Sequence, residues 1–337
     1  MGSGKLAELP VLDLSRMALG PIERNHFLAE LRQTAHGIGF FYLTGHGVDP
    51  VLVHDILATS RRFFNLPIQD KLAIEMLHSP HFRGYTRVGM ERTRGLPDWR
   101  EQIDIGAELP ARPMDTGLES WWWLQGPNQW PAALPELKSL VLRYQAAVTD
   151  VAIRLVRAFL AALDQDEHTF DAIFNPHPQQ LIKLIRYPGR ESTEGDQGVG
   201  AHKDGGFVTM LLQDVQNGLQ VDYEGEWISA PPIPGTFIIN IGELLEMASD
   251  GYLRATVHRA VTPPPGTDRL AVGFFFGACL DASIPVLSLK SELAAEMRGV
   301  TVDPLNPMFH DTGKNQMKSR LRSHPDVAQR HHAALLS

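Results

Sequence analysis

The longest regular pattern of apolar side chains lies between residues 135 and 165. Apolar residues recur there every three or four positions, which places them along one face of an α-helix. They are Leu137, Val141, Tyr144, Val148, Val151, Leu155, Phe159 and Leu163. The spacing therefore predicts one long helix with a buried face.

The segment before this helix mixes both kinds of pattern. Helical spacing covers residues 21–37, and Asp49-Pro50 opens a second helix. Residues 9–15 alternate like a short strand, and the β-prone run at 39–43 ends in the turn residues Gly45-His-Gly47. This part is expected to contain two helices and two strands.

After residue 165 the hydrophobic period changes from 3.6 to 2. Short strands are predicted at 181–187, 207–212, 219–221, 227–228, 236–240, 256–257 and 270–276. Pro, Gly and Asp interrupt them at short intervals, a pattern that favours a sandwich, jelly roll or barrel over a parallel α/β sheet. From residue 292 onwards we expect helical pieces and a polar tail that includes His331-His332.

Composition narrows the class of protein. The 337 residues are 43% hydrophobic and 21% charged, as in soluble globular proteins. The net charge of −8 argues against nucleic acid as a partner, and no apolar run is long enough for a membrane helix. Cys279 stands alone, so no intrachain disulfide can form and a reducing, cytoplasmic location is expected.

The candidate chemistry centres on His202, Asp204 and His258. In an extended segment residues i and i+2 point to the same side, so His202 and Asp204 can face one point, and a distant histidine can complete the set. Two imidazoles and one carboxylate leave a divalent metal three open positions, as in non-haem Fe(II) oxygenases. A single His-x-Asp pair is weak support, because a histidine in a surface turn is as common.

Arg269 strengthens this interpretation. It follows His258 by eleven residues and leads into the apolar strand predicted at 270–276. A buried arginine is costly unless it meets an anion, and its planar fork suits a carboxylate. The alternative is a structural ion pair.

Several motifs then occur together in order. They are GFFYLTGHG at 39–47, RGY at 83–85, GPNQWP at 126–131, GLQVDYEGEW at 218–227, PGTFIINIGE at 234–243 and TVHR at 256–259. This set resembles the 2-oxoglutarate- and Fe(II)-dependent oxygenases of the isopenicillin N synthase-like group, from about residue 9 to 276.

The resemblance implies a fold and a set of ligands. The fold is α+β, with a double-stranded β-helix (jelly-roll) core, an N-terminal α/β region at 1–130, and the long helix, core and C-terminal helix at 131–337, all expected to form one compact unit. His202, Asp204 and His258 would bind iron, Arg269 would pair with the distal carboxylate of 2-oxoglutarate, and Tyr187 would help to bind the cosubstrate or substrate. A core tyrosine at a strand end is the alternative for Tyr187.

Two positions depart from the family pattern. The group usually places serine two residues after the arginine, where this chain has Ala271, and it often has threonine where this chain has Lys203. The missing hydroxyl removes a hydrogen bond worth roughly 0.5–1.5 kcal/mol, which weakens 2-oxoglutarate binding without excluding it. By alternation Lys203 points away from the iron.

The resemblance thus implies an enzyme that uses Fe(II), 2-oxoglutarate and O2 to oxidise a small organic molecule, by hydroxylation, desaturation or ring closure, with release of succinate and CO2. Arg83, Tyr85, Arg92 and Phe276 are candidates for the substrate pocket. A 2-oxoglutarate-independent oxidase of the isopenicillin N synthase type and a non-enzymatic metal-binding jelly roll are the alternatives. The substrate and the oligomeric state stay open.

Overall fold

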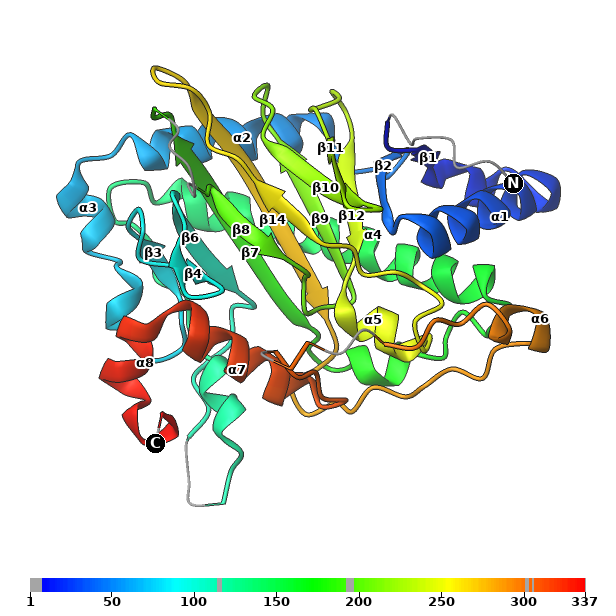
Figure 1. The fold of residues 1–337 in the computed structure, drawn as a ribbon. Helices are drawn as coiled ribbons and strands as arrows, with labels where there is room; N and C mark the ends of the chain where they lie inside the picture. The colour runs from blue at the N-terminus through cyan, green and yellow to red at the C-terminus, as the bar shows by residue number, and fades with distance from the viewer. Residues whose placement is uncertain (1–7, 114–116, 192–196, 301–302, 305, 337) are drawn as a thin grey trace.

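A computed structural model describes residues 8–113, 117–191, 197–300, 303–304 and 306–336. Within these residues the strands form a large sheet, a small sheet and a hairpin (Figure 1). The large sheet has the order β1 (Val11–Asp13), β2 (Phe40–Thr44), β12 (Phe237–Ile241), β9 (Val208–Gln213), β14 (Asp268–Gly277), β7 (Gln179–Pro188), β6 (Glu101–Gly106) and β3 (Gly84–Thr86). The small sheet has the order β11 (Glu226–Ser229), β10 (Leu219–Tyr223), β13 (His258–Ala260) and β8 (Val199–His202). The hairpin pairs β4 (Arg92–Thr93) with β5 (Leu96–Pro97).

The chain alternates between the two sheets from β7 onwards. β7, β9, β12 and β14 belong to the large sheet, whereas β8, β10, β11 and β13 belong to the small one. Side chains from both sheets pack together between them: Ile185 and Ala271 of the large sheet meet Val199 and Ala260 of the small sheet. This arrangement is the double-stranded β-helix that the family resemblance implies.

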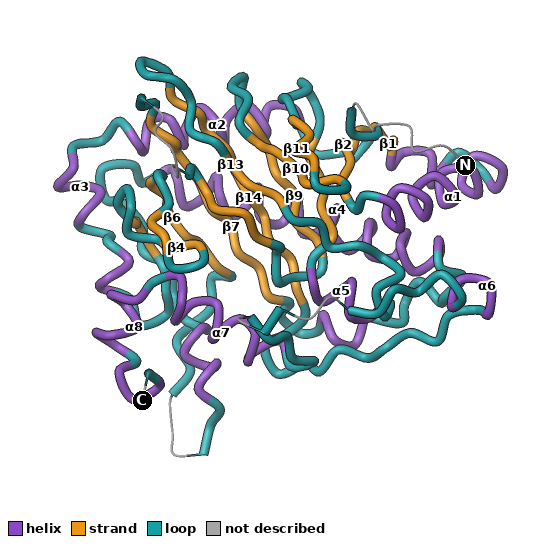
Figure 2. Tube along the Cα trace, in the orientation of Figure 1, coloured by secondary structure: helices purple, strands orange, loops and turns teal. Residues whose placement is uncertain are grey.

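Helices cover the other side of the large sheet, and α2 and α4 lie behind the strands in the orientation of Figures 1 and 2. The α-helices of the described residues are α1 (Pro21–Gly37), α2 (Pro50–Phe64), α3 (Ile68–Leu72), α4 (Glu136–Ala162), α5 (Glu243–Ala248), α6 (Ser291–Ala294), α7 (Thr312–Ser323) and α8 (Pro325–His331). All eight apolar residues of the predicted long helix are buried, seven within α4 and Leu163 at its C-cap. None of the described helices is both long enough and apolar enough to cross a membrane.

The two faces of the large sheet differ. On the outer face, which meets the helices, alternate residues of β7 and β14 such as Leu184, Val272 and Phe274 are fully buried in the main core. On the inner face, which meets the small sheet, the intervening residues include Lys183, Tyr187 and Arg269. Because successive strand residues point to opposite sides, each strand contributes to both faces.

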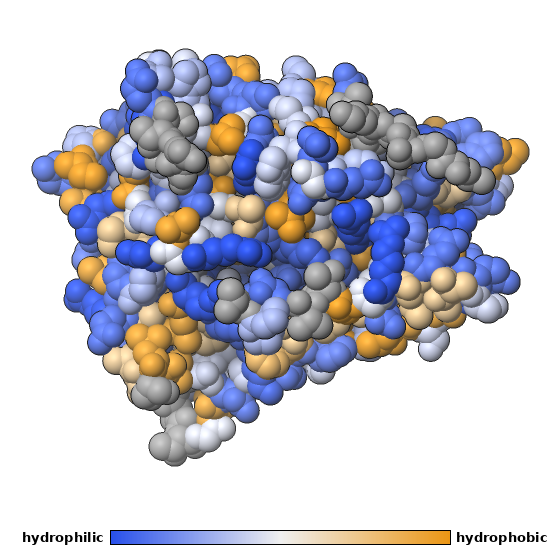
Figure 3. Space-filling view, in the orientation of Figure 1, coloured by the Kyte–Doolittle hydropathy of each residue, from blue (hydrophilic) through white to orange (hydrophobic). Residues whose placement is uncertain are grey.

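Most predicted elements are present, with three corrections. The strand expected at 256–257 begins instead at His258, and the strands β3, β4, β5, β6 and β8 were not predicted. The C-terminal segment is not a solvated tail: α7 and α8 pack on the body of the protein, and His332 is 3% exposed and stacks on Phe82. The viewed face of the molecule is mainly hydrophilic, with scattered apolar side chains (Figure 3).

Candidate metal and cosubstrate site

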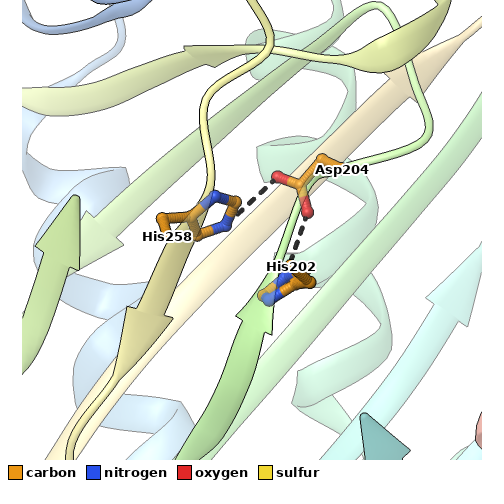
Figure 4. Close-up of side chains that lie close together, drawn as sticks. All are labelled: His202, Asp204 and His258. Carbon is orange, nitrogen blue, oxygen red and sulfur yellow. Dashed lines mark ion pairs between the residues drawn. The ribbon is translucent and has the colours of Figure 1, made fainter. Parts of the chain in front are cut away.

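The structure brings His202, Asp204 and His258 together between the two sheets (Figure 4). His202 ends β8, His258 begins β13, and these two residues are direct partners in the strand ladder. The Nε2 atoms of His202 and His258 lie 3.4 and 3.7 Å from the two carboxylate oxygens of Asp204. Metal–ligand bonds of about 2.0–2.2 Å fit a cation between such atoms with little movement.

The backbone fixes which nitrogen of each histidine is available. His202 Nδ1 lies 2.8 Å from the carbonyl of Gly200, and His258 Nδ1 lies 3.2 Å from the carbonyl of Thr256. A carbonyl only accepts, so each Nδ1 must carry the hydrogen and donate it. The lone pair of each neutral imidazole is then on Nε2, which faces the shared point.

Asp204 is held by neighbours that leave one oxygen open. Its Oδ2 accepts hydrogen bonds from Thr209 Oγ1 at 2.6 Å and Asn240 Nδ2 at 2.8 Å. The first turn of α5 holds the loop, because the backbone N–H of Glu243 donates to the Asp204 carbonyl at 2.7 Å. A Cβ on Gly242 would lie 2.1 Å from the Gly206 carbonyl oxygen, so only glycine allows this close approach.

Charges at the site favour metal binding. Burial opposes ionisation of Asp204, but the adjacent histidines outweigh it and hold the pKa of its carboxyl far below the usual range. Burial and the nearby His202 lower the pKa of His258 to about 4, so this imidazole is neutral at neutral pH. The side chain of His202 is 30% exposed, against 5% for Asp204, and it marks the accessible side of the cluster.

Arg269 lies on the inner face of β14 and is 1% exposed. Its Nη2 donates to Gln213 Oε1 at 2.7 Å, while its Nε and Nη1 are buried without a hydrogen-bond partner among the described residues. A Cβ on Gly218 would lie 2.9 Å from Arg269 Cδ, so this glycine makes room for the side chain. A buried N–H donor without an acceptor lowers the stability of the folded protein. A bound carboxylate would accept hydrogen bonds from both of these nitrogens.

Tyr187 is the direct strand partner of Arg269. The guanidinium carbon of Arg269 lies 4.8 Å from the centre of the Tyr187 ring, a cation–π contact. Ala271 is 1% exposed on the same face and packs in the cluster that contains Tyr187. Lys203 turns away from the cluster and pairs with Glu246 at 3.0 Å, as the alternation predicts.

The four residues expected to line the substrate pocket have different surroundings. Phe276 and Tyr85 pack in the main core on the outer side of the sheet, because their strand positions face the helices. Arg83 is buried and donates to backbone carbonyls, including that of Leu124 at 2.7 Å. Arg92 is exposed in the hairpin and donates to the Gly95 carbonyl. The expectation is wrong for Phe276 and Tyr85, and Arg83 has a structural role.

A buried charged cluster beside the site was missed. Lys183 Nζ lies 2.6 Å from Glu91 Oε1, and Arg320 of α7 donates to Asp104 Oδ2 at 2.6 Å. His324 lies 3.5 Å from Glu91. Arg320 and His324 come from the segment interpreted as a polar tail, where no local pattern marks them as buried. Gln213 and Asn240, the neighbours of Arg269 and Asp204, were missed as well.

Two family models match the chain. Residues 9–133 match a model described as non-haem dioxygenase in morphine synthesis N-terminal, and residues 176–278 match the 2OG-Fe(II) oxygenase superfamily. The two matches fall on the N-terminal region and on the sheets that carry the histidine–aspartate cluster.

Two curated relatives and one solved structure point to the same family as these models. The chain is 35% identical to the 2-oxoglutarate-dependent dioxygenase frbJ of Dothideomycetidae sp. (strain 11243), over 96% of this chain and 91% of that protein. It is 36% identical to homoarginine-6-hydroxylase 2-ODD-C23.1 of Arabidopsis thaliana, over 86% and 91%. The crystal structure of a full-length Neurospora crassa protein in complex with α-KG and 5-formyluracil has a TM-score of 0.74 and 25% identity, and the match covers 95% of this chain and 97% of that one.

The fold and site define a 2-oxoglutarate/Fe(II) oxygenase of the isopenicillin N synthase-like group, and the chain belongs to this family. It is a dioxygenase that uses Fe(II), 2-oxoglutarate and O2. The alternatives of a 2-oxoglutarate-independent oxidase and a non-enzymatic metal-binding protein are therefore set aside.

Proposed function

We propose that this dioxygenase hydroxylates a small charged organic molecule, with Fe(II) held by His202, Asp204 and His258. The Nε2 lone pairs and the free Asp204 oxygen converge on one point, which is the donor set that suits this metal. This convergence is the observation that carries the proposal. When bound, iron and 2-oxoglutarate would supply the oxidation: 2-oxoglutarate would give succinate and CO2, with one oxygen atom of O2 entering succinate and the other entering the substrate.

Arg269 and Tyr187 are proposed to hold 2-oxoglutarate. The two unpartnered nitrogens of Arg269 suit the distal carboxylate, and the Tyr187 ring keeps the guanidinium in place. The amide of Gln213 fixes the third nitrogen and so orients the fork. These residues would bind and position 2-oxoglutarate. The two histidines and Asp204 would hold the metal beside it.

Charged residues occupy part of the inner face of the large sheet, where they pair with one another. Lys183, Glu91 and Asp104 lie within or beside the inner face of the sheet that faces the metal site. The resemblance to homoarginine-6-hydroxylases agrees with a charged substrate and makes L-homoarginine and L-arginine the first compounds to test. Hydroxylation is the reaction named for those relatives, and we carry it over as the expected reaction.

The proposal is tested by anaerobic loading with Fe(II) and 2-oxoglutarate, followed by visible spectroscopy. Wild-type protein should give the weak metal-to-ligand charge-transfer band of the chelate. Arg269→Ala should need about 10- to 100-fold more 2-oxoglutarate for the same band, because a charge-assisted contact is lost. Arg62→Ala, which removes a surface arginine with 60% of its side chain exposed, is the matched control. An unchanged 2-oxoglutarate dependence in Arg269→Ala would contradict the assignment.

A further inference from the structure

A second buried arginine, Arg100, lies on the inner face of the large sheet. It immediately precedes β6, whose Ile103 and Ile105 face the main core, so Arg100 shares the opposite face with Gln102 and Asp104. Glu101 is the strand partner of Arg186, which brings Arg100 level with Tyr187 on β7. Since Tyr187 is in turn the partner of Arg269, the two arginines flank this tyrosine.

Arg100 is also close to the metal-binding strand β8. Asp98 Oδ2 accepts a hydrogen bond from Arg100 at 3.2 Å, and Asp98 Oδ1 lies 3.4 Å from the backbone nitrogen of Gly200. Gly200 is two residues before His202 and carries the carbonyl that orients it. Arg100 is therefore linked through Asp98 to the strand that carries His202.

The hydrogen bonds of Arg100 use only one of its three nitrogens. Nη2 donates to Glu91 at 2.8 Å and to Asp98 at 3.2 Å. Nε is buried without a partner among the described residues, and the hydrogen bonds found between Arg100 and their side chains come from Nη2. A guanidinium has five N–H donors, so this fork retains donors for a further anion. The side chain is 9% exposed.

Burial would lower the pKa of Arg100, but the carboxylates of Glu91 and Asp98 outweigh burial and raise it. The guanidinium is therefore charged at any pH at which the protein is folded. A charged guanidinium group that is held in place and still has free N–H donors is a typical binding group for a carboxylate.

We propose that Arg100 binds a carboxylate of the substrate, so that the enzyme selects small carboxylic acids such as amino acids. This inference rests on the proposed function and deepens it. Arg269 holds the cosubstrate on one side of Tyr187, and Arg100 holds the substrate on the other. The substrate is then fixed at its carboxylate while another carbon is presented to the metal.

The test compares matched ligands before it changes the protein, because Arg100 variants can lose stability. Wild-type enzyme is assayed for substrate-stimulated succinate release with L-homoarginine, L-arginine, and the carboxamide of each. The carboxamide should raise the apparent KM about 10- to 100-fold with little change in kcat, since one charge-assisted contact is lost. A carboxamide that performs as well as its acid would overturn the proposal, as would a panel in which no carboxylate stimulates turnover.

Arg100→Lys and Arg100→Gln then separate recognition from structure. Both variants should lose most of the preference for acid over carboxamide, while the 2-oxoglutarate concentration for half-saturation stays unchanged. If Arg100 is only structural, the variants will lower activity with acid and carboxamide equally and keep the preference. Arg62→Ala is the charge-matched control.

The outcome can be told apart from failure of the proposed function. Formation of the charge-transfer band and slow succinate release without substrate both report the iron and 2-oxoglutarate sites alone. If these are present and the carboxylate preference is absent, the role of Arg100 is wrong and the proposed cosubstrate site stands. If the band itself is absent, the proposed function has failed first.

Discussion

The inner and outer faces of the large sheet are formed by alternate residues of the same strands, yet their chemistry is opposite. On β7, Ile182 and Leu184 are fully buried hydrocarbon on the outer face, whereas Lys183 and Tyr187 are polar residues on the inner face. On β14, Val272 and Arg269 show the same contrast. The comparison indicates that one strand can provide packing energy and a binding site at once, because the two sets of side chains do not share neighbours.

The largest effect should come from the cluster of His202, Asp204 and His258. Asp204→Ala removes the only carboxylate of the proposed iron site, and Fe(II) affinity and activity should fall by more than about 100-fold, beyond the 10–100-fold typical of residues that only support a ligand. Anaerobic Fe(II) titration and succinate release measure this. Asp150→Ala, with 70% of its side chain exposed on α4, is the control. Fe(II) affinity within a few-fold of wild type would show that Asp204 is not a ligand.

An outer-face substitution should have the converse effect. Leu184 is fully buried in the main core, so Leu184→Ala should lower the free energy of unfolding by about 2–5 kcal/mol through lost burial and a cavity. Fe(II) affinity and the charge-transfer band should be unchanged in the folded protein. Urea unfolding followed by circular dichroism gives the stability. A Leu184→Ala protein that is stable but binds Fe(II) poorly would mean that the two faces are coupled.

The smallest effect concerns Ala271, which is buried on the inner face near Arg269. Ala271→Ser restores the hydroxyl that the family usually has, and one neutral hydrogen bond should lower the half-saturating 2-oxoglutarate concentration by about 2- to 10-fold. Fe(II) affinity should not change. Steady-state succinate release at varied 2-oxoglutarate measures this. A higher half-saturating concentration would show that the hydroxyl is buried without a partner.

The outer face was easier to predict than the inner one. α4, β7 and β14 have regular apolar patterns, because the side chains that pack in the main core must be hydrophobic. β8 consists of Val-Gly-Ala-His, and three of its four residues give no strong hydrophobic signal. Its strand structure comes from pairing with β13, which local sequence does not encode.

The site was predictable only where a motif marks it. The His-x-Asp spacing and the distant His258 identified the metal cluster, and the arginine before an apolar strand identified Arg269. Arg100 has a related signal, since it precedes the alternating Ile103 and Ile105 of β6, but a short strand makes that signal weak. Arg320 has no such signal, because α7 is mainly polar. The burial of Arg320 depends on its partner Asp104, which is far away in the sequence.

His202 and His258 are paired directly across β8 and β13. Iron binding therefore depends on the correct pairing of these two strands and can be used to follow it. A shift of one residue between β8 and β13 would turn one imidazole to the other side of the small sheet and destroy the donor set. During refolding, the chain should therefore regain tight Fe(II) binding only after these two strands have paired in register. The time course of metal binding would then report the rate of a single long-range pairing step.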